Sequence, residues 1–163
     1  MTQKAIHLVL GVTGSIAAYK AADLVRLFQK RGWEVSVVMT PSATAFIGPL
    51  TLRTLSRNPV AVEMAAEDQE WNPEHIALAD RADVLVIAPC TANVIAKLAM
   101  GLADDLLSCT ALACQAPLVV APAMNVRMWE HPATRANVAC LRARGARIVE
   151  PGEGELACGA QGK

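Results

Sequence analysis

The chain has 163 residues, of which 15 are Lys or Arg and 15 are Asp or Glu, so its formal net charge is zero at pH 7. This balance argues against electrostatic binding to nucleic acid or to an anionic membrane, and no run of roughly 18–20 apolar residues is present that could span a bilayer. The hydrophobic fraction of 53% with only 4% aromatic residues instead predicts one domain with a large aliphatic core.

The cysteines indicate a reducing compartment. The sequence contains Cys90, Cys109, Cys114, Cys140 and Cys158. Because their number is odd and no CxxC pair occurs, neither a disulfide framework nor a metal site is predicted. The short apolar run at 5–11 leads directly into a glycine turn, so we interpret it as a buried strand rather than a signal peptide. We therefore expect a cytoplasmic protein.

The first half of the chain alternates between strand-like and helix-like patterns. A helix is expected after the first strand because Ser15 can cap its start and Gly32 can end it, with apolar residues at helical spacing between them. A second helical stretch is interrupted near Gly48 and Pro49. In chain order, the predicted elements are a strand at 5–11, a helix at 15–31, a strand at 34–39, one or two short helices over 43–56 and a polar surface loop over 63–74.

The second half continues this alternation and ends in an irregular tail. The predicted elements are a strand at 83–89, helices at 91–101 and 103–114, a strand at 116–122, a helix at 132–144 and a last strand at 146–151. Alternation at this spacing predicts a single α/β domain with right-handed crossovers and a doubly wound parallel sheet. Ligands of such sheets bind beyond the carboxyl ends of the strands, so we expect the functional residues in the loops that follow them.

Two of these loops suit a phosphate group. The turn at 11–17 places Gly14, Ser15 and Ile16 at the start of a helix, where backbone N–H groups can approach an anion. Thr40 and Ser42 follow the second strand with hydroxyls, whereas a dinucleotide-binding fold usually has a carboxylate there. The pattern favours a mononucleotide such as FMN over NAD. A tight turn and a helix cap explain the same residues almost as well.

Later loops also carry polar side chains close to buried strands. Pro89, Thr91 and Asn93 lie at the end of the third predicted strand, and the polar groups need partners or a ligand unless they only cap a helix. The amide of Asn125, in the string PAMNVRMW after the next strand, can donate two hydrogen bonds to a carboxylate. Met128 in the same string fits either a core or a binding site.

Two residues have side chains suited to moving protons. His75 follows the polar loop, and histidine alone has an ordinary pKa near neutrality, although a lone histidine is more often structural. Cys158 lies in a glycine-rich segment of the tail. A thiol there can act as a proton donor or a nucleophile, or be an incidental surface residue.

Taken in order, these segments resemble a known family. The strings GVTGSIAAYK, APCTANVIAKLAMGLADDLL, PAMNVRMW and ELACG, with His75 between the first two, occur in this order across nearly the whole chain. They resemble the homo-oligomeric flavin-containing cysteine decarboxylases, and among these most closely the phosphopantothenoylcysteine decarboxylases of coenzyme A synthesis. The most specific signals are PxMNxxMW at 122–129 and the downstream ACG. The resemblance implies a flavodoxin-like (Rossmann-like) domain over 1–163 that binds FMN and assembles as a trimer or a dodecamer of trimers.

The resemblance also implies a reaction and roles for single residues. The implied enzyme is a carbon-carbon lyase that converts 4′-phosphopantothenoylcysteine to 4′-phosphopantetheine by thiol oxidation, decarboxylation to an ene-thiol and re-reduction. His75 matches the family's essential histidine, Asn125 the asparagine that holds the substrate carboxylate, and Cys158 the cysteine that protonates the intermediate. Met128 is assigned to the substrate as well. The matching flavin-binding positions are Gly14, Ser15, Ile16, Thr40, Ser42, Pro89, Thr91 and Asn93.

Two features depart from the family pattern. Cys90 stands where relatives often have a small unreactive residue, which suggests a second thiol near the flavin. The sequence stops at Lys163, soon after Cys158, whereas many relatives continue into a synthetase domain that joins phosphopantothenate to cysteine. The expectation is therefore a flavoprotein domain whose partner synthetase domain is absent from this chain.

Other functions stay open on the same residues. An oxidative peptidyl-cysteine decarboxylase would stop at the ene-thiol, and the presence of Cys158 argues against it. A flavin prenyltransferase is disfavoured by His75 and PAMNVRMW, and an NAD-binding module by the missing GxGxxG. A non-catalytic FMN-binding regulatory subunit would keep the same fold, so only an activity measurement separates it.

Overall fold

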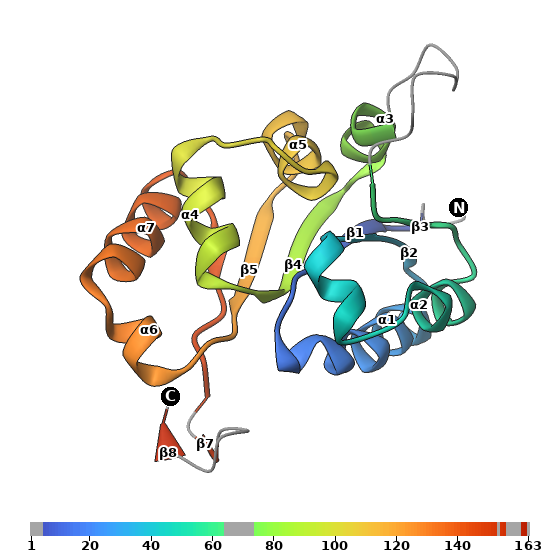
Figure 1. Ribbon diagram of the computed structural model, residues 1–163. Coiled ribbons are helices and arrows are strands. Elements are labelled where there is room, and N and C mark those ends of the chain that lie inside the picture. Colours follow the sequence, from blue (N-terminus) through green and yellow to red (C-terminus); the bar gives the residue numbers. More distant parts are fainter. Residues whose placement is uncertain (1–4, 64–73, 153, 156–160, 163) are drawn as a thin grey trace.

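The computed structural model describes residues 5–63, 74–152, 154–155 and 161–162, and a parallel β-sheet forms its centre (Figure 1). The six strands of this sheet are β1 (His7–Val12), β2 (Glu34–Met39), β3 (Val60–Ala61), β4 (Val84–Cys90), β5 (Leu118–Pro122) and β6 (Arg147–Ile148). They pair in the order β3-β2-β1-β4-β5-β6, and every pair is parallel. This order confirms the predicted doubly wound α/β fold. Two short strands, β7 (Gly154–Glu155) and β8 (Gln161–Gly162), form a separate antiparallel pair.

Helices cover both faces of the sheet. They are η1 (Ile16–Tyr19), α1 (Lys20–Lys30), η2 (Pro41–Ala45), α2 (Pro49–Ser56), α3 (Glu74–Arg81), α4 (Ala92–Met100), α5 (Leu106–Ala113), α6 (Val126–Glu130) and α7 (Pro132–Ala143), where η marks a 3-10 helix. The elements η1, α1, η2 and α2 pack on one face, and α3, α4, α5 and α7 pack on the other. None of the described helices is long and apolar enough to cross a membrane.

Strand β1 occupies the centre of the sheet, and all of its residues are buried. Because successive side chains of a strand point to opposite faces, Leu10 and Val12 pack with α1, whereas Val9 packs with α4 and α5. Gly11 lies so close to α5 that a Cβ there would be 2.6 Å from Leu107 Cδ1. The aliphatic core is therefore split into two layers with the sheet between them.

The predicted elements differ from the observed ones mainly at their ends. The predicted helix at 103–114 begins later, as α5, because Asp105 and Ser108 form a reciprocal cap: the Asp105 carboxylate accepts from the Ser108 N–H, and the Ser108 hydroxyl accepts from the Asp105 N–H. The predicted last strand at 146–151 is reduced to β6 at the edge of the sheet. The structure adds β3 and α6, and most of the predicted loop at 63–74 lies outside the described residues.

Candidate functional site

The strands β1 and β4 lie side by side, although the chain forms β2 and β3 before it reaches β4. The connections that leave these two strands therefore run in opposite directions, and the crevice at their carboxyl ends is the usual ligand position of such sheets. Gly14 and Ser15 follow β1, Ser42 follows β2, and Thr91 and Asn93 follow β4. The sheet thus brings three of the predicted cofactor-binding loops to one edge.

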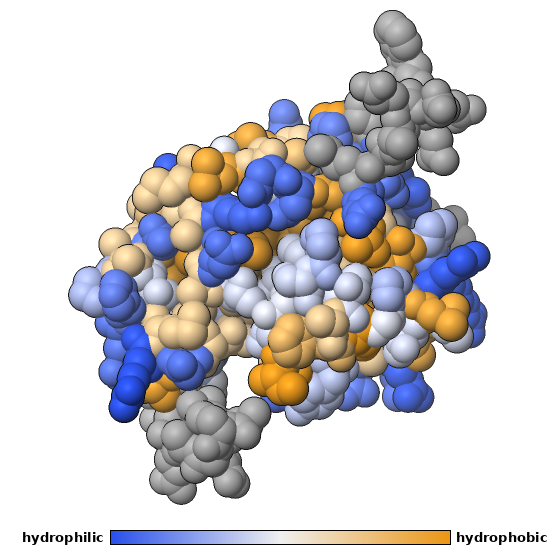
Figure 2. Space-filling model, viewed as in Figure 1, coloured by the Kyte–Doolittle hydropathy of each residue, from blue (hydrophilic) through white to orange (hydrophobic). Residues whose placement is uncertain are grey.

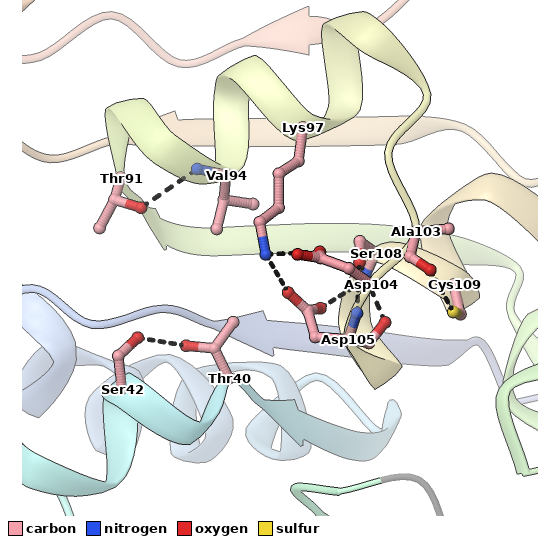
Figure 3. A network of polar contacts seen from close by, with 10 residues as sticks. All are labelled: Thr40, Ser42, Thr91, Val94, Lys97, Ala103, Asp104, Asp105, Ser108 and Cys109. Atoms are coloured by element: carbon pink, nitrogen blue, oxygen red, sulfur yellow. Dashed lines mark hydrogen bonds and ion pairs between the residues drawn. The ribbon is translucent and has the colours of Figure 1, made fainter.

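The loops after β1 and β2 pack directly against each other. A Cβ atom on Gly14 would lie 2.5 Å from Ser42 Oγ and 2.8 Å from Ser42 Cβ, so the close approach requires glycine. The buried Thr40 places its Oγ1 3.1 Å from Ser42 Oγ (Figure 3). Two hydroxyls are therefore held together, with that of Ser42 packed against the Gly14 backbone, and hydroxyl donors of this kind suit an anionic group.

Thr13 lies within the turn at 11–17 but was assigned no role from the sequence, yet it joins the loop after β1 to the end of β4. Its side chain is fully buried. The Oγ1 hydroxyl donates to the carbonyl oxygen of Pro89 at 2.8 Å and accepts from the backbone N–H of Thr91 at 3.0 Å. The backbone N–H of Thr13 donates to the same Pro89 carbonyl at 3.3 Å. The signal that could have found it is a polar residue directly after a wholly apolar strand, where its hydroxyl must find partners.

Ser15 and Thr91 each cap a helix, as the alternative interpretation of these residues predicts. Their hydroxyl oxygens accept from backbone N–H groups of η1 and α4, both at 3.3 Å. Because capping uses a hydroxyl only as an acceptor, each keeps its hydrogen for a further partner. Asn93 is exposed on the first turn of α4, and Ile16 is exposed at the start of η1. Capping and ligand binding are therefore compatible here.

Asn125 lies in the neighbouring loop, after β5, which is tied to the end of β4 by a hydrogen bond from the Ala123 N–H to the Cys90 carbonyl at 3.0 Å. The Oδ1 of Asn125 accepts from the N–H of Met128 at 2.8 Å and caps α6. Since the helix holds one end of the planar amide, the Nδ2 group with its two hydrogens faces away from it. Asn125 and Met128 are exposed, whereas Trp129 is buried beneath the guanidinium of Arg135.

His75 lies in the first turn of α3 and is half-buried. Helix α3 packs against α5, and the Cys114 thiol at the end of α5 donates to the Ala79 carbonyl at 3.9 Å. Figure 1 shows α3 and α6 on opposite sides of the molecule. One chain by itself therefore does not bring His75 next to Asn125.

Comparison with known proteins places this arrangement in a family. A sequence model described as Flavoprotein matches residues 1–163. The chain belongs to the flavoprotein family. The Bacillus subtilis relative named coenzyme A biosynthesis bifunctional protein CoaBC is 47% identical over 157 residues, which are 96% of this chain but 39% of that protein. The chain thus spans about two fifths of the length of this bifunctional relative (39%).

A shorter relative and a solved structure match over most of their length. The Streptococcus mutans protein named "Probable phosphopantothenoylcysteine decarboxylase" is 47% identical over 161 residues, which cover 98% of this chain and 88% of that protein. The crystal structure of the FMN-dependent cysteine decarboxylase SpaF superposes with a TM-score of 0.86 at 39% identity, covering 97% of this chain and 90% of that one. The flavodoxin-like fold is thereby confirmed.

Two cysteines of this flavoprotein were singled out from the sequence, Cys158 and Cys90. Cys158 lies outside the described residues. Cys90 is fully buried among core residues such as Ile87, and burial raises the pKa of its thiol far above the ordinary range. Cys90 is thus a buried, protonated thiol, and its expected nearness to the flavin stays a prediction. Within the described ranges, no three His, Cys, Asp and Glu side chains gather as metal ligands would.

A lysine held by two carboxylates links α4 to the start of α5 in this flavoprotein, and no motif indicated it (Figure 3). The Nζ of Lys97 lies 2.6 Å from Asp104 Oδ1 and 2.7 Å from Asp105 Oδ2. The hydrogen bonds that Lys97 donates to Asp104 and Asp105 raise its pKa. Burial alone would raise the pKa of Asp105, but its hydrogen bonds from Lys97 and Ser108 lower it overall. Lys97 and Asp105 therefore stay ionised at neutral pH and hold α4 to the start of α5.

Apolar side chains reach the surface over α4 and α5. Met100, Leu102 and Leu112 are 69%, 56% and 63% exposed. Figure 2 shows apolar residues gathered over these two helices. Leu102 and Leu112 also line a pocket of about 490 Å³ between α4, α5 and α7, near the start of β5 and thus away from the three loops. The flavoprotein domain therefore presents an apolar surface separate from its candidate site.

Proposed function

We propose that this chain is a cytoplasmic FMN-dependent phosphopantothenoylcysteine decarboxylase, a lyase that releases CO2 from 4′-phosphopantothenoylcysteine. The name of the Streptococcus relative supports the substrate, that of the Bacillus relative supports a role in coenzyme A biosynthesis, and the name of the similar SpaF structure supports the cofactor. The observation that carries the proposal is the exposed amide of Asn125, in a loop bonded to the end of β4: its Oδ1 caps α6, and its Nδ2 has no hydrogen-bond partner among the described residues. Such donors suit a substrate carboxylate.

The chemistry of the three loops fits FMN. Hydroxyls of Ser15, Ser42 and Thr91 and the amide of Asn93 provide donors, and Gly14 lets the loop that carries Ser42 pack closely against the loop after β1. Hydroxyl and backbone N–H groups of this kind bind a phosphate without needing a cation. When bound, FMN would supply a two-electron acceptor that later returns the electrons.

The substrate itself explains why an oxidation precedes the loss of CO2. Its carboxylate is attached to a carbon that bears an amide nitrogen, so direct decarboxylation would leave an unstabilised carbanion. Removal of two electrons and two protons turns the neighbouring CH2–SH into a thioaldehyde, whose C=S group accepts the electron pair of the breaking C–C bond. One proton on the resulting ene-thiolate gives the ene-thiol. Two electrons and two further protons then restore a saturated thiol, and no net oxidant is consumed.

In this proposal, the protein's own residues bind the carboxylate and move the protons. Asn125 holds the carboxylate through Nδ2, with Met128 beside the substrate. His75 assists the proton transfers of thiol oxidation, and Cys158 supplies a proton during the return to the saturated thiol. A positioned acid or base of this kind contributes about 10²–10⁴-fold to the rate.

We also propose that the chain acts as a homo-oligomer built from trimers. The exposed apolar residues over α4 and α5 support self-association. The separation of α3 from α6 supports it too, because a second copy could place its own His75 beside Asn125. In the same proposal, residues 1–163 form the decarboxylase domain and a synthetase activity belongs to a separate domain. The proposed partners are the small-molecule substrate and further copies of the chain, with neither nucleic acid nor membrane.

The test is to incubate the FMN-loaded protein with 4′-phosphopantothenoylcysteine in the absence of air and to measure the product mass. Loss of CO2 alone, giving 4′-phosphopantetheine, is the expected result. Loss of CO2 and of two further hydrogens would instead assign the oxidative reaction that ends at the ene-thiol. Unchanged substrate in the presence of bound FMN would contradict the proposal and favour another substrate or a regulatory role.

A further inference from the structure

We propose that Thr13 is a positioning residue for the flavin site: its hydroxyl sets the spacing between the loops after β1 and β4, and thereby the width of the crevice between them. The inference rests on the proposed function, because it takes FMN as the occupant of that crevice. Thr13 does not itself touch the cofactor in this proposal. It acts through Thr91 on one side and through Gly14 on the other.

The first step of the argument is that one hydroxyl makes both of the side-chain contacts between the two loops, in addition to the hydrogen bond from the Thr13 backbone N–H to Pro89. A threonine hydroxyl has one hydrogen to donate and oxygen lone pairs to accept with. The hydrogen goes to the Pro89 carbonyl at 2.8 Å, and the oxygen accepts from the Thr91 N–H at 3.0 Å. Valine has nearly the same shape but can make neither contact. Its presence at position 13 would leave the Thr91 N–H without this acceptor.

The second step is that the contacted groups belong to the predicted cofactor-binding residues. The N–H of Thr91 belongs to the residue whose own hydroxyl caps α4, and Asn93 follows two positions later. A shift of Thr91 would therefore move the start of α4. On the opposite side, Gly14 is the next residue after Thr13 and is packed against Ser42. Thr13 thus belongs to the loop after β1 and is hydrogen-bonded to the loop after β4.

The third step is a comparison with Thr110, which is as fully buried as Thr13 but lies inside α5 rather than between two loops. Thr110 is fully buried, and its hydroxyl donates to the Leu106 carbonyl at 2.8 Å within α5. Substitution of Thr110 removes a buried hydrogen bond, but this bond lies within one helix and does not join two loops. If Thr13 served only the stability of the fold, substitution at either site would have the same effect on flavin binding.

The experiment compares FMN binding by Thr13→Val, Thr13→Ser and Thr110→Val with that of the wild-type chain. Titration of the apo protein with FMN gives the dissociation constant, and the visible absorption and fluorescence of the bound flavin report its surroundings. We expect Thr13→Val to raise the dissociation constant about tenfold and to alter the flavin spectrum. Thr13→Ser keeps the hydroxyl and should restore both. Thr110→Val should lower the urea midpoint without changing either flavin readout.

The outcomes separate the two levels of the proposal. If wild-type protein does not bind FMN, the proposed function is wrong and the role of Thr13 is wrong with it. If wild type binds FMN but Thr13→Val binds it as tightly as Thr110→Val does, with the same spectrum, only the role of Thr13 is overturned. Should Thr13→Val not fold, Thr13→Ala removes the same two hydrogen bonds from a smaller side chain and is judged by the same criteria.

Discussion

At the scale of single residues, Asn125 uses the two ends of one amide for different purposes. Its oxygen caps α6 by accepting from the Met128 N–H, and its nitrogen faces outward. A residue that only capped the helix could be Ser, Asp or Thr with similar stability. The amide becomes distinctive when the outward end must donate to a carboxylate, which aspartate cannot do.

Substitution of Asn125 by Asp should therefore separate capping from substrate binding. The carboxylate oxygen still accepts from Met128, but the two donors are lost and a negative charge faces the substrate carboxylate. We expect kcat/KM to fall about 100-fold or more with the urea midpoint unchanged. Asn125→Ala, the matched control, should lose activity and also about 1 kcal/mol of stability. Near-normal kcat/KM in the Asp variant would remove Asn125 from the carboxylate site.

Gly14 offers a second test at this scale, on the packing of the loops after β1 and β2. Gly14→Ala places a methyl group against Ser42, so we expect the free energy of unfolding to drop by about 1–3 kcal/mol and FMN binding to weaken. Urea unfolding and flavin titration measure the two effects. In Gly152→Ala the added Cβ would meet nothing within 4 Å, so this variant should resemble wild type. Equal behaviour of the two variants would contradict the close contact.

The residues of the site could be predicted only where a local pattern marks them. Gly14, Thr91 and Asn125 lie directly after apolar strands, and their position at the ligand edge follows from the alternation of strands and helices. Thr13 also follows a strand directly, but the contacts that Thr13 and Lys97 make could not be predicted from a local pattern. Their partners come close only when the chain folds. Pro89 and Thr91 are 76 and 78 residues away from Thr13 in the sequence, and Asp105 is 8 residues away from Lys97.

At the scale of elements, the contact of Lys97 with Asp104 and Asp105 joins α4 to α5. Helix α5 in turn packs on α3, which carries His75, so this contact connects the cofactor loops to the predicted catalytic histidine. We expect a coupling of about 1 kcal/mol between Lys97→Met and Asp105→Asn in a double-mutant cycle at pH 7, measured by urea unfolding. The exposed Arg142–Glu150 pair provides the control, with a coupling near zero. A Lys97–Asp105 coupling no larger than that of the control would refute the role.

The coupling should also depend on pH in a defined direction. The pKa of Asp105 is lowered in the folded state, so its contribution is present above its unfolded value of about 4 and is lost as pH falls through the lower folded value. The pKa of Lys97 is raised, so its contribution is present below about 10 and is lost as pH rises through the higher folded value. The same cycle repeated in strongly acidic buffer should therefore give a smaller coupling than at pH 7. An unchanged value would show that ionisation is not involved.

Secondary-structure elements were predicted correctly where the periodic pattern extends over many residues, and they were missed where the element is short. The strands β1, β2, β4 and β5 and the helices α1, α4 and α7 follow clear patterns of buried residues. β3 has two residues and α6 has five, too few to show a period. The edge strand β6 is shorter than the predicted strand at 146–151 because only Arg147 and Ile148 pair with β5.

At the scale of the whole molecule, the separation of His75 from Asn125 is the feature that a single chain leaves unexplained. Both residues belong to the proposed active site, yet α3 and α6 lie on opposite sides of the domain (Figure 1). A ring of identical subunits solves this geometry, since each interface of a ring joins two different surfaces of the chain. A site at such an interface would take His75 from one copy and Asn125 from the next.

Mixing two inactive variants tests this arrangement. His75→Asn and Asn125→Asp should each be nearly inactive alone, because every site in either oligomer lacks one residue. When the two are mixed in equal amounts, unfolded and refolded together, some interfaces join an intact His75 to an intact Asn125. We expect about a quarter of wild-type activity, because one site in four then receives both residues. The refolded single variants are the controls. If the mixture stays as inactive as they are, while wild type regains activity by the same procedure, both residues must come from the same chain and α3 must move toward α6 within it.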